Sequence, residues 1–260
     1  MTDAPRVRTD VDGVIGRVML ARPEKKNALD HQTALELARA LEALERDAAV
    51  RVVRLGGDGA DFCAGADLES LEAMIDADPK LHLRDAHALG RVFTIIRGMT
   101  KPVVAVVQGR ALAGGAGLAT ACDVVLAHEG AQFGYPEVRI GFVPAMVMTM
   151  LRRSVGEKRA FDLVSSGRLI PAREALEMGL VSRVFAAGGF SAGVDAVLAD
   201  LAKAGADAMR LTKRLFYDLD DLGFAEGIDL GAHTNVASRA TDDFKNGVRR
   251  FVRRIREGAG

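Results

Sequence analysis

Runs of apolar residues divide the first two thirds of the chain into short strands and amphipathic helices. The β-branched runs 50–55 and 103–107 are short enough to be buried strands, and residues 14–20 are expected to form a first strand, which the following residues 21–23 (Ala-Arg-Pro) stop. After Asp30, apolar positions recur at helical spacing, which predicts a helix capped by that side chain. Further helices are expected at 81–97, 144–153, 156–166 and 171–179, and short strands at 124–127, 131–134 and 181–185.

The last part of the chain has a different pattern, because no strand-like run follows residue 190. Helices are expected at 191–204, 206–219, 223–239 and 241–256. Strands that alternate with helices, followed by an all-helical end, indicate an α/β core with a C-terminal helical appendage. We expect the boundary near Gly188-Gly189, which gives a core of residues 1–189 and a helical region of residues 190–260.

Composition and charge exclude several classes of protein. The chain has 260 residues, 49% of them hydrophobic, and its 35 basic residues balance 35 acidic ones, which argues against a global field for nucleic acid or membranes. The two cysteines, Cys63 and Cys122, favour a reducing cytoplasm, and neither a secretory signal nor an apolar run of the ~18 residues of a spanning helix is expected. The C-terminal arginines are expected to form a solvated helix face: Arg249, Arg250, Arg253, Arg254 and Arg256.

Two glycine-containing corners carry the candidate chemistry. The run 103–107 leads to Gly114, Gly115 and Gly117 at the start of a small-residue helix, and residues 63–67 (CAGAD) form a second strand–turn–helix corner. Such corners leave backbone N–H groups free at a helix N-terminus, where negative charge is stabilised. A dinucleotide site is disfavoured because Thr120 stands at the third glycine position of that motif, and no Walker-type lysine follows the glycines. Tight helix–strand packing remains the structural alternative.

Several motifs, in order along the chain, resemble the crotonase superfamily of enoyl-CoA hydratases and isomerases. They are RPEKKNAL (22–29), FCAGADL (62–68), GRALAGGAGLATACD (109–123), AQFGYPEVRIGFVP (131–144), SGRLIPAREALEMGLVSRVF (166–185) and DFKNGVRRFV (243–252). The resemblance implies a crotonase-like α/β spiral of ββα units, with C-terminal helices that serve trimerisation and cover the active site. It also implies a homo-oligomer, either a trimer or a dimer of trimers, without a role for nucleic acid or membrane.

The resemblance further implies an acyl-CoA thioester as substrate, with no permanently bound cofactor and no metal. The backbone N–H groups of Ala66 and Gly114 match the two donors that stabilise an enolate on the thioester oxygen. Residues expected to contact CoA are Lys25, Lys26, Ala64, Asp67, Leu68 and Lys245, the last from this subunit or a neighbour.

The catalytic carboxylates depart from the pattern of the family's typical hydratases, which use two glutamates. The second is present as Glu137, but Gly117 occupies the position of the first. Glu137 alone can still move a proton between carbons, as the family's one-glutamate isomerases do. Candidates to replace the missing acid are Tyr135, Asp67, Glu69, Glu72 and His87.

Three functions therefore stay open, besides other CoA-thioester reactions such as decarboxylation, dehalogenation and C–C cleavage. The first is hydration of a 2-enoyl-CoA, the second is isomerisation of an enoyl-CoA by Glu137 alone, and the third is an acyl-CoA-binding or RNA-contacting protein without hydratase turnover. The segment 136–146 (PEVRIGFVPAM) also resembles the branch that contains methylglutaconyl-CoA hydratases. Met146, Met148 and Met150 are candidates for an adaptable acyl pocket, with core packing as the alternative.

Overall fold

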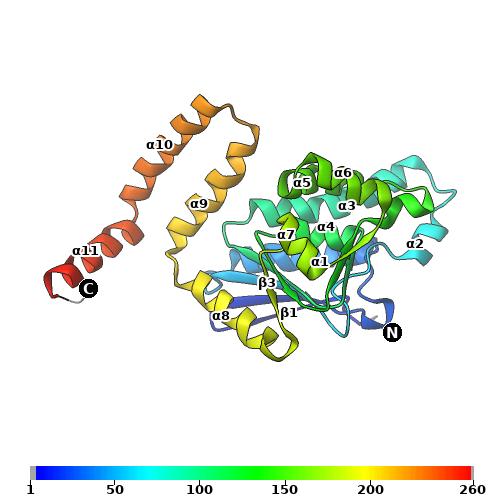
Figure 1. Cartoon of the computed structure of the whole chain (residues 1–260), viewed down its shortest axis with the longest axis horizontal. Coiled ribbons are helices and arrows are strands. Elements are labelled where there is room, and N and C mark those ends of the chain that lie inside the picture. Colours follow the sequence, from blue (N-terminus) through cyan, green and yellow to red (C-terminus); the bar gives the residue numbers. More distant parts are fainter. Residues whose placement is uncertain (1–3, 259–260) are drawn as a thin grey trace.

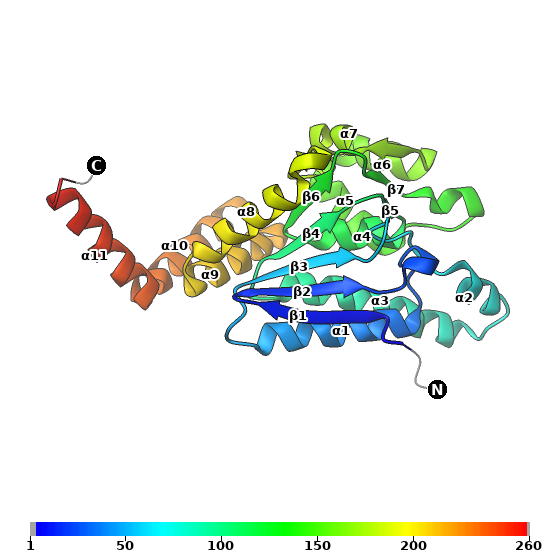
Figure 2. The same ribbon diagram turned by 90° about the horizontal axis from the view of Figure 1, so that it is seen from below.

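The computed structural model describes residues 4–258 as a sheet of mostly parallel strands with helices on both faces (Figures 1 and 2). The six-stranded sheet has the order β1-β2-β3-β4-β6-β9, in which β1 is antiparallel to β2 and the other neighbours are parallel. Its strands are β1 (Val7–Asp12), β2 (Ile15–Leu20), β3 (Val52–Gly57), β4 (Val103–Val107), β6 (Val124–His128) and β9 (Arg183–Phe185).

A smaller sheet of three short strands lies beside the carboxyl ends of the large one. β5 (Arg110–Leu112) runs parallel to β7 (Gln132–Gly134), and β8 (Leu169–Pro171) is antiparallel to β7. Isolated parallel bridges from Cys63 to Ala111 and from Ala66 to Leu29 add two more extended segments beside it. The strand directly before the corner at Gly114 is therefore β5 and not the longer β4, because the chain crosses between the sheets at residues 108–109.

Helices cover the large sheet on both faces because its central strands are apolar on both sides. Val103, Ala105 and Val107 of β4 belong to the main core, whereas Val104 and Val106 face a second cluster. The main core is covered by α1 (His31–Arg46), α3 (Pro79–Gly98), α4 (Gly114–Ala121), α5 (Ala145–Val155), α6 (Glu157–Ser166) and α7 (Ala172–Met178). The short α2 (Leu68–Ala73) lies at the edge, and its described residues include no buried one.

The C-terminal helices are α8 (Phe190–Lys203), α9 (Ala206–Asp218), α10 (Phe224–Ala240) and α11 (Asp242–Arg256). α8 packs Val194, Val197 and Leu198 on the second face of the sheet, so by packing it belongs with the core. Lys213 of α9 donates hydrogen bonds to the carbonyls of Ile96 and Lys101 and pairs with Asp123 at 2.7 Å. α10 and α11 extend away from the sheet (Figures 1 and 2) and have no buried residue.

The α/β fold and the helices expected from the sequence are confirmed. The division at residues 189 and 190 stays a prediction, although α8 and α9 pack directly on the sheet. Among the described residues, no helix is both long enough and apolar enough to cross a membrane.

Candidate active site at two backbone corners

The two glycine corners lie against each other at the end of the smaller sheet. Cys63 donates its N–H to the Arg110 carbonyl at 2.9 Å and accepts the Leu112 N–H at 3.0 Å, so the two segments run side by side. At Gly65, which has φ +97°, an added Cβ would lie 2.8 Å from the Ala113 Cβ and 2.9 Å from the Leu112 oxygen. Only glycine permits this approach, which places residues 66 and 114 at adjacent points of the site.

The N–H groups of Ala66 and Gly114 donate no hydrogen bond to any other group within residues 4–258. Leu29 bonds the residues on either side of Ala66, with its N–H on the Gly65 carbonyl at 2.7 Å and its own carbonyl accepting the Asp67 N–H at 2.8 Å. In a parallel bridge this pattern turns the backbone N–H of Ala66 to the opposite side. Gly114 is the first residue of α4, so its N–H has no acceptor within the helix. Both residues are only half-buried, so a ligand can reach these donors.

Ala113 has a strained backbone that sets the direction of the Gly114 N–H. Its φ of 49° and ψ of −123° are rare for a residue with a side chain, and such strain costs about 1–3 kcal/mol. The Ala113 N–H donates to the Gly134 carbonyl at 2.8 Å, and its own carbonyl accepts the Gly117 N–H at 2.9 Å. Bonds on both sides of the residue therefore hold it in this conformation.

Glu137 brings a buried carboxyl group to the same end of the smaller sheet. It lies in the short 3-10 helix η2 (Pro136–Ile140), three residues after Gly134, which pairs with Leu112 on the neighbouring strand. The Glu137 residue is 8% exposed, and its Oε2 atom is buried without a hydrogen-bond partner among the described residues. Burial raises the pKa of this carboxyl group, which its own backbone N–H only partly offsets.

Apolar side chains fill the position of the missing first glutamate. A Cβ at Gly117 would lie 2.7 Å from Val147 Cγ2 and 3.1 Å from Phe93 Cζ. Both side chains are buried, Val147 on α5 and Phe93 on α3. The structure therefore leaves no space for a carboxylate at residue 117 unless these side chains move.

The expected substitutes for that glutamate are engaged elsewhere or exposed. The Tyr135 hydroxyl is bonded to Thr120 at 2.8 Å, and Asp67 caps α2 and pairs with Arg22. Glu69 forms an ion pair with Lys25, whereas Glu72 and His87 are exposed. Within residues 4–258, no group of three histidine, cysteine, aspartate or glutamate side chains is placed to hold a metal ion.

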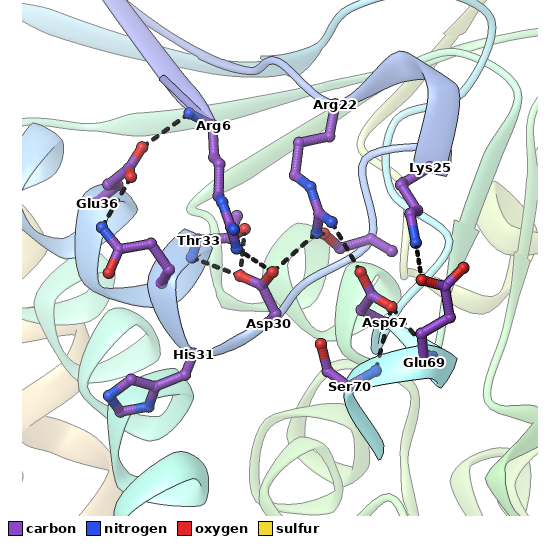
Figure 3. Close-up of polar contacts among 12 residues, drawn as sticks. Arg6, Arg22, Lys25, Asp30, His31, Thr33, Glu36, Asp67, Glu69 and Ser70 are labelled. Carbon is purple, nitrogen blue, oxygen red and sulfur yellow. Dashed lines mark hydrogen bonds and ion pairs between the residues drawn. The ribbon is translucent and has the colours of Figure 1, made fainter. Parts of the chain in front are cut away.

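Arg22 was not among the candidate site residues, although the sequence placed it at the end of a strand and at the start of the RPEKKNAL motif. Its guanidinium donates to the Ala28 carbonyl and to Asp67, each at 2.8 Å, and lies 3.2 Å from Asp30 (Figure 3). Asp30 also pairs with Arg6. This cluster ties the start of α1 to the residue that follows Ala66.

The residues expected to contact CoA are only partly brought together. Lys25 forms an ion pair with Glu69 at 2.5 Å, which brings it close to the corner formed by residues 63–67, called the outer corner below. The Lys26 carbonyl accepts the Ala64 N–H of this corner at 3.0 Å. Leu68, two residues after Ala66, is 67% exposed. Lys245 is exposed on α11, at the opposite end of this chain from α2 (Figure 1).

The Arg22 cluster predicts a specific dependence of stability on pH. Burial alone would raise the pKa of Asp67, but the Arg22 hydrogen bond, the Ser70 N–H and the charges of Arg22 and Lys25 lower it below its usual value. A lowered folded-state pKa stabilises the fold above the unfolded value of ~3.9, and this contribution is lost as the pH falls through the folded value. We therefore expect Arg22→Met to lower the free energy of unfolding by about 1.5–3 kcal/mol at neutral pH, with a smaller difference near pH 3.

Urea denaturation followed by far-UV circular dichroism measures both differences. Arg39→Met, at an exposed position of α1, serves as the matched control and should leave stability unchanged at both pH values. A loss for Arg22→Met that is equal at neutral and acidic pH would contradict an electrostatic role.

Comparisons with known proteins agree with the geometry over nearly the whole chain. Residues 10–257 match the family model described as Enoyl-CoA hydratase/isomerase. A Thermus thermophilus protein named as an enoyl-CoA hydratase is 44% identical over 92% of this chain and 94% of its own. The 2,3-dehydroadipyl-CoA hydratase of Escherichia coli is 31% identical over 90% of this chain and 91% of its own. The enoyl-CoA hydratase structure from Mycobacterium smegmatis superposes with a TM-score of 0.92 at 27% identity, covering 96% of this chain and 97% of that one.

The chain belongs to the enoyl-CoA hydratase/isomerase family, the crotonase superfamily.

Proposed function

We propose that the protein hydrates a 2-enoyl-CoA thioester and holds the enolate in an oxyanion hole formed by the Ala66 and Gly114 N–H groups. One observation carries this proposal: two backbone donors and one oxygen of a buried carboxyl group lie at the same end of the smaller sheet, and none of the three has a partner in the described part of the chain. The hydratase names of relatives that match over nearly the full chain support the same reaction.

The proposed reaction needs Glu137 as its one proton carrier. The Glu137 carboxylate accepts a proton from water while the water oxygen bonds to C3 of the substrate. The C2–C3 π electrons move to form the enolate, whose negative charge rests on the thioester oxygen between the two N–H donors. Glu137 then returns the proton to C2, which restores the carboxylate. Each backbone donor of such a site contributes about 3–4 kcal/mol to stabilisation of the transition state.

The burial of Glu137 suits this double role. A base that becomes the acid of the next step works best when its pKa lies near the operating pH. Burial raises the pKa of Glu137 towards that range.

Isomerisation of a 3-enoyl-CoA is the second candidate, because Val147 and Phe93 occupy the space of a second carboxylate. In this reaction Glu137 removes a proton from C2 and returns it to C4, and the same two donors hold the enolate. Hydration differs in that Glu137 takes its proton from water, whose oxygen bonds to C3, and delivers it to C2.

The CoA part of the substrate is proposed to lie along the outer corner, where Lys25, Lys26, Ala64, Asp67 and Leu68 are found. The Ala64 N–H is already used, but its carbonyl accepts no hydrogen bond within residues 4–258 and can receive one from an adenine amino group. Lys245 belongs to α11, which lies at the opposite end of the chain from α2 (Figure 1), so we propose that it contributes from another copy. The free thiols of Cys63 and Cys122 agree with the reducing cytoplasm proposed as the location.

We also propose a homo-oligomer, a trimer or a dimer of trimers, in which α10 and α11 are covered by other copies. These helices expose large apolar side chains, including Phe224 at 88%, Val236 at 69% and Phe251 at 66%. A hollow of about 840 Å³ between the end of α9 and the start of α10 is lined by acidic side chains, and α11 carries a cluster of arginines. Helices without tertiary burial are marginal in water, so a partner surface is needed.

Sedimentation should therefore show a particle well above the 27.6 kDa of one chain. Phe251→Asp is expected to shift the distribution towards the single chain, because a charge would have to be buried in the interface. Val11→Ser, at an exposed position of β1, is the control. A monomeric parent protein would refute the assembly.

A paired-substrate assay separates the two reactions. Crotonyl-CoA hydration and migration of the double bond in a 3-enoyl-CoA are measured for the parent protein, Glu137→Gln and the exposed control Glu72→Gln. We expect Glu137→Gln to lower the rate of whichever reaction the parent protein catalyses by about 10²–10⁴-fold, because the amide can neither take up nor return the proton. Double-bond migration without hydration would favour the isomerase, and an active Glu137→Gln would contradict the role of the residue.

The apolar cover of Gly117 gives a second prediction. Gly117→Glu alone is expected to lower the melting temperature, because Val147 occupies the space. The double variant Gly117→Glu/Val147→Ala makes room for the second carboxyl group, and we expect its hydration rate to exceed that of Val147→Ala by about tenfold or more. An unchanged rate in a folded double variant would show that the second carboxyl group does not limit hydration.

A further inference from the structure

Tyr135 connects the end of β7 to η2, two residues before Glu137, and its ring is fully buried. Two hydrogen bonds hold this connection against the segment that contains Gly114 and α4. The Gly134 carbonyl accepts the Ala113 N–H at 2.8 Å, and the Tyr135 hydroxyl lies 2.8 Å from Thr120 Oγ1 on α4. Pro136 then restricts the backbone between Tyr135 and Glu137.

The hydrogen-bond roles in this pair follow from the number of protons available. The Thr120 hydroxyl has one proton, and it is donated to the Ala116 carbonyl at 2.7 Å. The Tyr135 hydroxyl must therefore donate to Thr120 Oγ1. Burial raises the pKa of the Tyr135 phenol, so the group keeps the proton that this bond requires.

Helix α4 connects the Gly114 N–H donor to the segment that carries Glu137. Gly114 stands at its first residue and Thr120 lies six residues further, which corresponds to a rise of about 9 Å along the helix. The residues of α4 from Gly115 onward are buried. By contrast, Oε2 of Glu137 has no polar partner within residues 4–258, so the position of this carboxyl group depends on its backbone.

We propose that Tyr135 and Thr120 are positioning residues. Their buried hydrogen bond connects the segment that carries Glu137 to α4, and it thereby fixes the position of the Glu137 carboxyl group relative to the Gly114 N–H at the start of α4. The proposal rests on the function proposed above for Glu137. A misplacement of about 1 Å between reacting groups can lower a rate by about 10²-fold. The bond therefore acts on turnover and not on CoA affinity, since the segments expected to contact CoA lie on other loops.

Tyr135→Phe removes the donor and keeps the ring. We expect kcat to fall about 10- to 100-fold with crotonyl-CoA while KM changes little. Thr120→Ser keeps the hydroxyl and should retain kcat. Thr120→Val leaves the buried phenol without an acceptor, so it should lower the melting temperature more than Tyr135→Phe does.

The double variant Tyr135→Phe/Thr120→Val separates positioning from stability. Replacement of both partners by apolar groups of similar shape is expected to restore much of the melting temperature. If the bond positions Glu137, kcat stays low in this variant. Recovery of kcat together with the melting temperature would overturn the proposal.

Tyr217→Phe is the matched control, because Tyr217 is the other tyrosine of the chain. Its hydroxyl donates to Asp123 at 2.7 Å, at the contact of α9 with the core. We expect this variant to lower the melting temperature without changing kcat. A decrease in kcat equal to that of Tyr135→Phe would also overturn the proposal.

Hydrogen exchange gives a readout that does not require activity. The amides of Val138, Arg139 and Ile140 in η2 should exchange faster in Tyr135→Phe than in the parent or in Tyr217→Phe. If the parent lacks activity on enoyl-CoA while these amides exchange faster in Tyr135→Phe, the proposed function fails. The structural role of the Tyr135–Thr120 hydrogen bond then still stands. If the exchange rates do not change, the proposed role of this hydrogen bond is refuted.

Discussion

The contact between Gly65 and Ala113 is the constraint on which the candidate site depends. An ordinary side chain at residue 65 would overlap both the Ala113 methyl group and the Leu112 carbonyl. Separation of the two segments would break the bonds between Cys63 and the β5 strand, and the Ala66 and Gly114 N–H groups would no longer be adjacent. The donors thus depend on a backbone approach that no polar side chain can replace.

Charge is distributed around this contact in two distinct ways. On the outside, Arg22 neutralises Asp67 and Asp30, and it stabilises the loop that carries Ala66 (Figure 3). On the inside, the two N–H groups and one oxygen of Glu137 have no partner within the described chain. Unpaired polar groups are costly in a folded protein, and they are usually retained where a ligand completes them.

The sequence predicted the parts of the fold that have a clear period, and it missed the parts that are too short to have one. Helical spacing located α1, α3 and the four C-terminal helices to within a few residues. The three-residue strands β5 and β8 have no measurable alternation, and the edge strand β1 is largely exposed and polar, so none of them was expected. The role of β5 is the largest omission, because it directly precedes the Gly114 corner.

The candidate site was predictable where it depends on the backbone and less so where it depends on distant contacts. Glycine patterns indicated both corners, and the family resemblance singled out Glu137 and Gly117. What fills the space at Gly117 comes from Phe93 and Val147 on two other helices, and no local pattern reveals such packing. The Arg22 cluster likewise joins residues up to 45 positions apart.

A single carboxyl group imposes a condition that two carboxyl groups do not. With two, one group can hold water while the other protonates C2, and mutual repulsion helps to raise one of their pKa values. In this chain residue 117 is a glycine and supplies no such repulsion, so burial alone must raise the pKa of Glu137. Burial is effective only while the carboxyl group stays in its buried position. In the proposed reaction, the packing at Gly117 therefore makes the placement of Glu137 more important for turnover.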